Sequence, residues 1–184
     1  MPFTEVSIPG LLVFEPSVFA DSRGFFFESY NEKLFAAQGI HDHFVQDNQS
    51  KSEYGVVRGL HFQQNPYAQT KLVRVLVGKI LDVAVDIRKN SPTYGQVFSI
   101  ELSAENKKQL YIPKGFAHGF SVLSEVAEVL YKCDNFYNKQ SEGGILLDDK
   151  TLNIDWKVSP DKMIVSDKDK QNSPFESLVT NFDY

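Results

Sequence analysis

Short apolar runs separated by turn-forming residues fill the middle of the chain, and their spacing limits the fold more than any other feature. The runs cover residues 72–77, 80–87, 97–102, 109–112, 120–123 and 126–132, and each is bounded by Gly, Pro, Asn or Ser. Strands of this length, about 8–12 residues apart, are typical of β-sandwiches and barrels. The pattern therefore predicts an all-β fold of two antiparallel sheets, of the jelly-roll type.

The flanking segments predict smaller elements around this barrel. Residues 31–38 form the best helix candidate, because Asn31 can cap the first turn. From about residue 151 the chain becomes polar, with Trp156 as an expected anchor onto the core. We therefore expect one domain over residues 1–184, with short peripheral helices and a C-terminal extension that packs on the barrel.

Composition and charge exclude several classes of protein. An apolar content of 42% in 184 residues is enough for a core and too high for a disordered chain. The net charge of −5 argues against a basic face for nucleic acid. Cys133 is the only cysteine, which fits a reducing compartment. The chain starts with no secretion signal and contains no apolar run near about 18 residues, so we expect a cytoplasmic protein without a membrane partner.

Three consecutive aromatic residues, Phe25 to Phe27, follow a turn at residues 21–24. Side chains of a strand alternate between its two faces, so an all-aromatic run needs cover on both. Either the fold covers both faces or a partner subunit covers one of them.

Residues 55–71 concentrate the chemistry-bearing side chains Arg58, His61 and Lys71. Strict alternation would place Arg58 and His61 on opposite faces of a strand. Gly59, which lies between them, can mark a β-bulge that turns one of them toward the other.

Metal and nucleophile chemistry find little support in the sequence. A small-barrel metal site needs two histidines at i and i+2, but His61 is followed by Phe62 and Gln63. His118 adds only one further ligand, so we expect no metal. Cys133 lies in a predicted strand without the surroundings of a reactive thiol, and the sequence has neither a nucleophile elbow nor a P-loop.

A proton-abstracting site fits the remaining residues better. His61 is the natural general base, because an imidazole titrates near neutral pH. In isolation, such a histidine is more often a hydrogen-bonded core residue. Asp167 or Asp169 can orient its ring and raise its basicity. Asp82 and Asp86 are interpreted as hydrogen-bonding or solvated residues instead of proton shuttles.

The complementary roles fall to three other side chains. Tyr131 can return a proton, and Lys71 with Arg58 can stabilise an oxyanion in a dry pocket. Each also has an ordinary interpretation, a strand aromatic for Tyr131 and a solvated pair for Lys71 and Arg58. Their occurrence together with His61 favours catalysis.

A set of motifs between about residues 8 and 170 gives these residues a context. They are Asp21-x-Arg23-Gly24-Phe25-Phe26-x-Glu28, Gln46-Asp47-Asn48, Arg58-Gly59-Leu60-His61-Phe62-Gln63, Lys71-Leu72-Val73-Arg74, Asp82-Val83-Ala84-Val85-Asp86-Ile87-Arg88, Pro113-x-Gly115-Phe116-Ala117-His118-Gly119-Phe120 and Tyr131-Lys132. Together they closely resemble the dTDP-4-dehydrorhamnose 3,5-epimerase family, a metal-free branch of the cupin superfamily. The resemblance implies a double-stranded β-helix, the cupin form of the jelly roll.

The resemblance also implies a reaction without a cofactor. Its substrate would be dTDP-4-dehydro-6-deoxy-D-glucose and its product dTDP-4-dehydro-L-rhamnose. By motif position, His61 corresponds to the base and Asp169 to its partner. Lys71 corresponds to the group that steadies the C4 enolate, and Tyr131 to the acid on the other face.

The resemblance further implies the substrate contacts and a homodimer. Tyr137 matches the ring that stacks on thymine, and Arg23 and Glu28 would reach into the partner's site. The other contacts implied are Gln46, Asp47, Asn48, Arg58, His118, Glu142 and Lys168.

Several alternatives stay open at this level. A related enzyme that inverts only C5 or only C3 would carry nearly the same residues, and the preference for dTDP over UDP is not fixed. A non-catalytic sugar-nucleotide-binding barrel would need no acid–base pair. A metal-dependent cupin would need more ligands than His61 and His118. Whether Asp167 or Asp169 partners His61 is also open.

Overall fold

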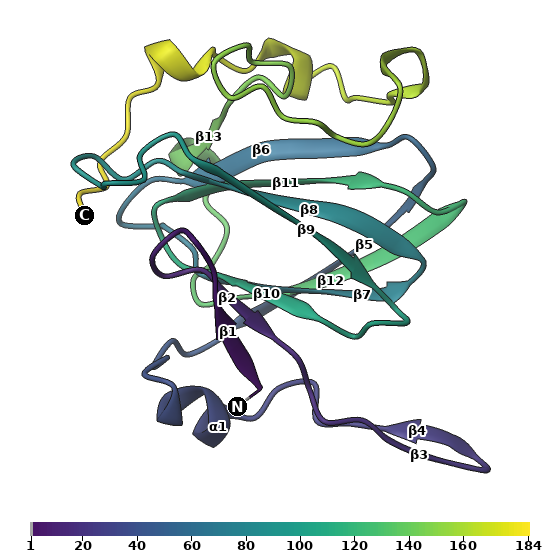
Figure 1. Ribbon diagram of the computed structural model, residues 1–184. Coiled ribbons are helices and arrows are strands. Elements are labelled where there is room, and N and C mark those ends of the chain that lie inside the picture. Colours follow the sequence, from purple (N-terminus) through teal and green to yellow (C-terminus); the bar gives the residue numbers. More distant parts are fainter. Residues whose placement is uncertain (1) are drawn as a thin grey trace.

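Two antiparallel β-sheets stacked face to face form the body of the molecule, in a computed structural model that describes residues 2–184 (Figure 1). One sheet contains, in spatial order, β1 (Phe3–Glu5), β2 (Leu12–Phe14), β10 (Gln109–Ile112), β7 (Lys71–Val77), β12 (Val126–Cys133) and β5 (Gln46–Glu53). The other contains β13 (Glu142–Gly144), β6 (Val57–Gln63), β11 (Phe116–Val122), β8 (Lys79–Asp86) and β9 (Val97–Ser103). This arrangement confirms the predicted jelly roll.

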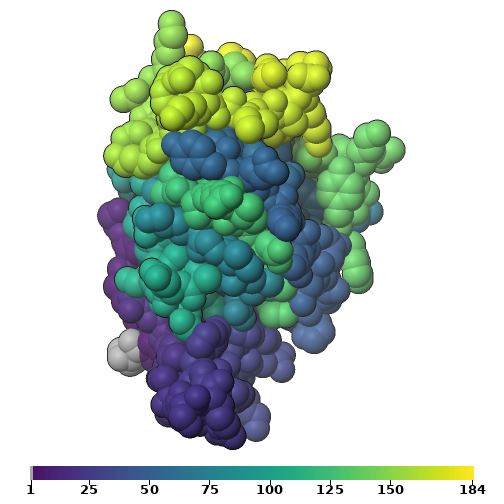
Figure 2. All heavy atoms as spheres, turned by 90° about the vertical axis from the view of Figure 1, so that its right-hand side faces the viewer, coloured from purple at the N-terminus to yellow at the C-terminus, as the bar shows by residue number. Residues whose placement is uncertain are grey.

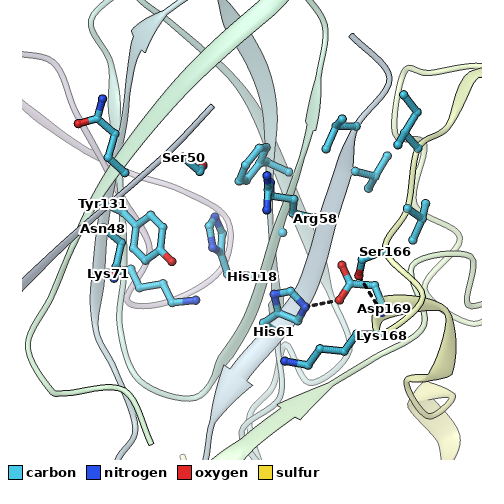
Figure 3. Close-up of a pocket in the computed structure, with 17 residues that line it drawn as sticks. Asn48, Ser50, Arg58, His61, Lys71, His118, Tyr131, Ser166, Lys168 and Asp169 are labelled. Carbon is cyan, nitrogen blue, oxygen red and sulfur yellow. Dashed lines mark hydrogen bonds and ion pairs between the residues drawn. The ribbon is translucent and has the colours of Figure 1, made fainter. Parts of the chain in front are cut away.

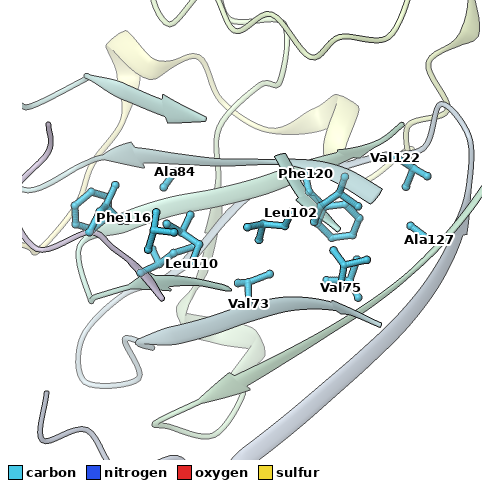
Figure 4. Packing of buried hydrophobic residues seen from close by; sticks show 14 of the residues in the cluster. Val73, Val75, Ala84, Leu102, Leu110, Phe116, Phe120, Val122 and Ala127 are labelled. Atoms are coloured by element: carbon cyan, nitrogen blue, oxygen red, sulfur yellow. The ribbon is translucent and has the colours of Figure 1, made fainter. Parts of the chain in front are cut away.

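Apolar side chains from both sheets fill the space between them (Figure 4). Val73 and Val75 of β7 meet Phe116 and Phe120 of β11, and all four are buried. Complete burial of a side chain of this size contributes about 1.5–3 kcal/mol. This core fills most of the space between the sheets. The polar side chains that face the interior are grouped outside it.

A second core covers the outer face of the five-stranded sheet. Leu60 and Phe62 of β6 point away from the barrel interior and pack with Trp156 and Phe175 of the C-terminal segment. Figure 2 shows that segment, in yellow, across one end of the molecule. Because the sheet is covered on both faces, β8 is buried along almost its whole length. The expected role of Trp156 as an anchor is confirmed. The single domain over residues 1–184 stays a prediction.

Short helices lie at the periphery. The predicted helix is α1 (Glu32–Ala37), and the Asn31 side chain caps it by accepting from the backbone N–H groups of Lys33 and Leu34. The other helices are single 3₁₀ turns, η1 (Lys139–Ser141), η2 (Pro160–Lys162), η3 (Asp169–Gln171) and η4 (Phe175–Ser177).

An N-terminal arm carries the aromatic run. The arm is the hairpin of β3 (Phe19–Asp21) and β4 (Gly24–Phe26), which extends away from the barrel (Figure 1). Phe25 and Phe26 are 61% and 67% exposed, so this chain alone does not cover them. The interpretation in which the fold of one chain covers both faces is therefore wrong, and cover by a partner subunit stays a prediction.

One strand differs by more than one residue from its predicted bounds. β11 begins at Phe116 instead of residue 120, because it is buried on both faces and shows no alternation. β5 contains only polar residues, and it forms an edge that pairs only with β12. Over residues 2–184, no helix has the length and apolar character needed to cross a membrane.

Candidate active site

A pocket of about 670 Å³ lies between the two sheets and the C-terminal segment (Figure 3). The six-stranded sheet contributes Asn48, Lys71 and Tyr131. The five-stranded sheet contributes Arg58, His61 and His118, and the C-terminal segment adds Ser166, Lys168 and Asp169. Strands and segments far apart in the sequence therefore bring together all four of the residues expected to be catalytic.

His61 and Asp169 form a hydrogen-bonded pair at one side of this pocket. The Nε2–H of His61 donates to Asp169 Oδ1 over 2.7 Å, and the Asp169 side chain is almost fully buried. Ser166 Oγ accepts from the backbone N–H of Asp169 at 3.1 Å, which helps to position the turn. Asp167 is 93% exposed at its side chain and faces away. Of the two candidate carboxylates, Asp169 is therefore the one that contacts His61.

A β-bulge explains how one strand supplies both Arg58 and His61. In the register of β6 with β11, His61 faces His118 and Arg58 faces Phe120, so two residues of β6 lie opposite Gly119 alone. Gly59 has a positive φ of 124°, and a Cβ there would lie 2.6 Å from the Cα of Gly119. Only glycine fits such a position. The bulge expected at Gly59 is thus present, and the Arg58 and His61 side chains line the same pocket.

Lys71 and Tyr131 lie across the pocket from His61 (Figure 3). The Lys71 Nζ is 5.7 Å from the centre of the Tyr131 ring. Burial lowers the pKa of Lys71, and the charges of Asp82 and Glu142 oppose that shift. Burial raises the pKa of Tyr131, against the effect of the nearby Arg58 charge. The pocket thus holds a phenol that keeps its proton and an ammonium that gives one up more readily than usual.

His118 belongs to a second buried pair. Its Nε2–H donates to Asp82 Oδ1 over 2.7 Å, and the Asp82 residue is 0% exposed. Burial lowers the pKa of His118, and Asp82 opposes the shift. Of the two interpretations of Asp82 and Asp86, hydrogen-bonding or solvated, the first is confirmed for both.

A chain of polar contacts leads from the pocket to an exposed aromatic ring. Gln46 donates to the Asn48 side chain at 3.0 Å and accepts from the backbone N–H of Tyr137 at 3.3 Å. The Tyr137 hydroxyl donates to Glu142 at 2.9 Å, and Lys168 forms an ion pair with the same carboxylate at 2.5 Å. These contacts fix an exposed ring next to the His61 side of the pocket.

A smaller cavity of about 360 Å³ borders the same histidine. Its lining includes His61, Glu142 and Lys168. Burial alone would raise the pKa of Glu142, but its bonds with Lys168 and Tyr137 lower it overall. Glu142 is therefore an anion at neutral pH.

The other expected substrate contacts lie outside the pocket. Asp47 alternates away from Asn48 on β5 and pairs with Lys132 at 3.0 Å. Arg23 lies on the arm and pairs with Asp21, and Glu28 accepts from Asn31. Within residues 2–184 of one chain, neither Arg23 nor Glu28 lines the pocket.

Sequence reasoning missed part of the pocket lining. Ser50, Ile164, Val165 and Ser166 face the cavity, although none belongs to a type that marks a site by itself. Ser50 could have been found from the alternation with Asn48 along β5. Among residues 2–184 there is no group of three or more His, Cys, Asp or Glu side chains that could hold a metal ion.

Comparisons with known proteins agree with this geometry. The sequence profile of dTDP-4-dehydrorhamnose 3,5-epimerase matches residues 5–177. The chain is 57% identical over 176 residues to the dTDP-4-dehydrorhamnose 3,5-epimerase of Shigella flexneri, which covers 95% of this chain and 96% of that one.

Solved structures are equally similar. The crystal structure of dTDP-4-dehydrorhamnose 3,5-epimerase from Elizabethkingia anophelis has a TM-score of 0.91 at 53% identity and covers 95% of this chain and 96% of that one. The structure of dTDP-6-deoxy-D-glucose-3,5-epimerase from Legionella pneumophila, in complex with dTDP-4-keto-L-rhamnose, has a TM-score of 0.92 at 46% identity, with coverages of 96% and 94%. The chain therefore belongs to the dTDP-4-dehydrorhamnose 3,5-epimerase family.

Proposed function

We propose that His61 is the base and Tyr131 the acid in the epimerisation, at C3 and C5, of dTDP-4-dehydro-6-deoxy-D-glucose to dTDP-4-dehydro-L-rhamnose. The observation that carries this proposal is the position of the two side chains on opposite sides of one pocket, with Lys71 beside Tyr131. Inversion of a carbon centre requires removal of a proton from one face and its return to the other. Two groups across a cavity meet this requirement.

The C4 ketone of the substrate makes this chemistry accessible. Its carbonyl acidifies the hydrogens on both C3 and C5, because each carbanion delocalises onto O4 as an enolate. The Lys71 ammonium would stabilise the charge on O4, and one such donor contributes about 3–4 kcal/mol. Over residues 2–184 no ion pair engages Lys71, so its charge is available to a ligand.

The contact with Asp169 sets the tautomer of His61, the proposed base. Because a carboxylate only accepts, the His61 proton resides on Nε2 and the lone pair on Nδ1. His61 Nδ1 would take the proton from carbon, and Asp169 would stabilise the imidazolium that results. Tyr131 would then donate its phenolic proton to the opposite face. Before the second inversion the imidazolium would release its proton to solvent and the phenolate would take one up. Inversion at both carbons requires the sugar to turn between the two events.

The nucleotide part of the substrate would hold it through both inversions. Arg58 and Asn48 line the pocket and suit the pyrophosphate and its neighbouring groups. The exposed Tyr137 ring, fixed by Glu142 and Gln46, suits stacking on thymine. Lys168 adds a cation at the same rim. These contacts support dTDP as the carrier.

We also propose a homodimer in which the arm reaches the partner's site. The exposed Phe25 and Phe26 need a cover that one chain does not provide. The Arg23 side chain is 88% exposed and lies on the same hairpin. A partner's Arg23 and Glu28 would add a cation and a hydrogen-bonding group to the rim. The cytoplasmic location expected from the sequence stays a prediction.

Solvent labelling tests the catalytic proposal. The protein would be incubated with dTDP-4-dehydro-6-deoxy-D-glucose in deuterated water, and label at C3 and C5 read by NMR. Deuterium at both carbons with inversion at both is the expected result. Label at only one carbon would contradict the double inversion, and full labelling by an H61N variant would remove His61 as the base.

A further inference from the structure

The buried pair of His118 and Asp82 has a role that the reaction scheme leaves open. The two residues come from neighbouring strands, β11 and β8, and in their register Phe120 faces Asp82 and His118 faces Ala84. Both side chains therefore point into the barrel. His118 lines the pocket, whereas Asp82 lies behind it and touches the cavity only through the histidine. A wholly buried carboxylate at this depth is costly unless a specific contact offsets it.

The contact fixes which ring nitrogen of His118 faces a ligand. Asp82 Oδ1 accepts from Nε2–H at 2.7 Å, so Nε2 carries a proton and Nδ1 is the nitrogen left for the substrate. The titratable groups around the ring are Asp82 on β8, Lys71 on β7 and His61 on β6. Burial lowers the pKa of the ring, so Nδ1 is a bare acceptor at neutral pH.

An acceptor at this position has a definite chemical consequence. It repels the ketone oxygen and the enolate, both of which need donors, and it attracts a hydroxyl group. Among the sugar hydroxyls, the one on C3 swings as that centre inverts, so it cannot keep one contact throughout. The hydroxyl on C2 keeps its configuration and lies next to the reacting C3.

We propose that Asp82 is a positioning residue that holds His118 Nδ1 as the acceptor for the sugar C2 hydroxyl, which makes the site selective for 4-keto sugars that carry this group. The proposal rests on the proposed epimerase function and adds a specificity determinant to it. Asp82 itself touches no substrate and acts through His118. A site built around such a hydrogen bond rejects an analogue that lacks the hydroxyl.

Two variants of Asp82 separate the effect of its hydrogen-bond acceptor from the effect of its charge. D82L removes the acceptor and keeps a buried side chain of similar reach. D82N keeps a carbonyl acceptor but loses the charge. For wild type and both variants, kcat/KM would be measured with the natural substrate and its 2-deoxy analogue, and ¹⁵N NMR would report the His118 tautomer.

Wild type is expected to prefer the natural substrate by about 10- to 100-fold, the effect of one hydrogen bond in a dry site. D82N should keep most of this preference, and D82L should lose it while its His118 signal shows both tautomers. Equal discrimination by wild type and D82L would overturn the proposal. So would an Nδ1-protonated His118 in wild type, a readout that needs no turnover and also applies if D82L fails to fold.

The labelling experiment separates this proposal from the epimerase function. Deuterium at C3 and C5 without 2-deoxy discrimination would overturn only the role of Asp82. Absence of label at both carbons would overturn both.

Discussion

His61 Nε2 and Asp169 Oδ1 lie 2.7 Å apart, although 108 positions separate the two residues in the chain. The histidine belongs to β6, and the carboxylate belongs to the 3₁₀ turn η3. The proposed base and its partner thus come from a barrel strand and from a segment that packs on the barrel from outside.

Removal of the carboxylate should weaken the base. We expect D169N to lower kcat by about 10- to 100-fold, the usual effect of losing the partner of a functional histidine. Steady-state kinetics would measure it. D167N is the matched control, since Asp167 is exposed and does not contact His61. Equal losses in the two variants would refute the assignment of Asp169.

Loss of the base itself should be more severe. H61N should reduce kcat by about 10²- to 10⁴-fold, the range for general base catalysis, while dTDP still binds. Calorimetric titration with dTDP checks the binding. Near-normal proton exchange by this variant in deuterated water would be inconsistent with His61 as the base.

Removal of the phenol should separate exchange from inversion. Y131F keeps His61 and Lys71, so deuterium should still enter the substrate from the base side. Less inverted product should form, because the donor on the other face is missing. NMR of the recovered sugar distinguishes the two outcomes, and complete epimerisation by Y131F would exclude Tyr131 as the only acid.

The alkaline side of the pH profile should report Lys71. Burial lowers its pKa and raises that of Tyr131, so the ammonium loses its proton at a lower pH, and the phenol at a higher pH, than the same groups in water. Because the enolate needs the charged lysine, kcat should fall at a lower pH than an exposed lysine would allow. K71R holds its charge and should move this fall to higher pH, though at a reduced rate. An unmoved profile would point to another group.

The dimer can be tested by mixing two inactive variants. R23A lacks the arm's cation and H61N lacks the base. If Arg23 acts in the partner's site, a mixed dimer contains one site with both groups intact. Refolding the two variants together should therefore restore activity. Failure to recover any activity would place Arg23 outside the partner's site.

Sequence reasoning reached the strands and the residue types of the site, but not all of its geometry. The spacing of apolar runs was sufficient for the barrel, because a short apolar run bounded by turn-forming residues indicates a strand without knowledge of its partner. It could not choose between Asp167 and Asp169, since the choice depends on which carboxylate of a turn faces a strand 108 positions away. Nor could it place Asp82 behind His118, because pairing of β8 with β11 decides that contact.

The bulge at Gly59 was expected from the sequence, but its steric reason was not. The glycine suggested an interrupted pleat, and the register of β6 with β11 confirms it. What the sequence did not contain is the reason that no other residue fits: any side chain at Gly59 would begin with a carbon only 2.6 Å from the Cα of Gly119. The close approach of the Gly59 and Gly119 backbones depends on how β6 and β11 pair, so the sequence around Gly59 alone does not reveal it.

The C-terminal position of Asp169 determines when the proposed site can be completed during synthesis. A ribosome releases the barrel strands that carry His61, Lys71 and Tyr131 before it releases η3. Asp169 emerges 108 positions after the histidine that it contacts. A nascent or truncated chain that ends before Asp169 would contain His61, Lys71 and Tyr131, but the Asp169 carboxylate would be missing from the His61 ring. With Asp169 as the proposed partner of the base, full activity therefore requires that this late stretch of polypeptide has docked.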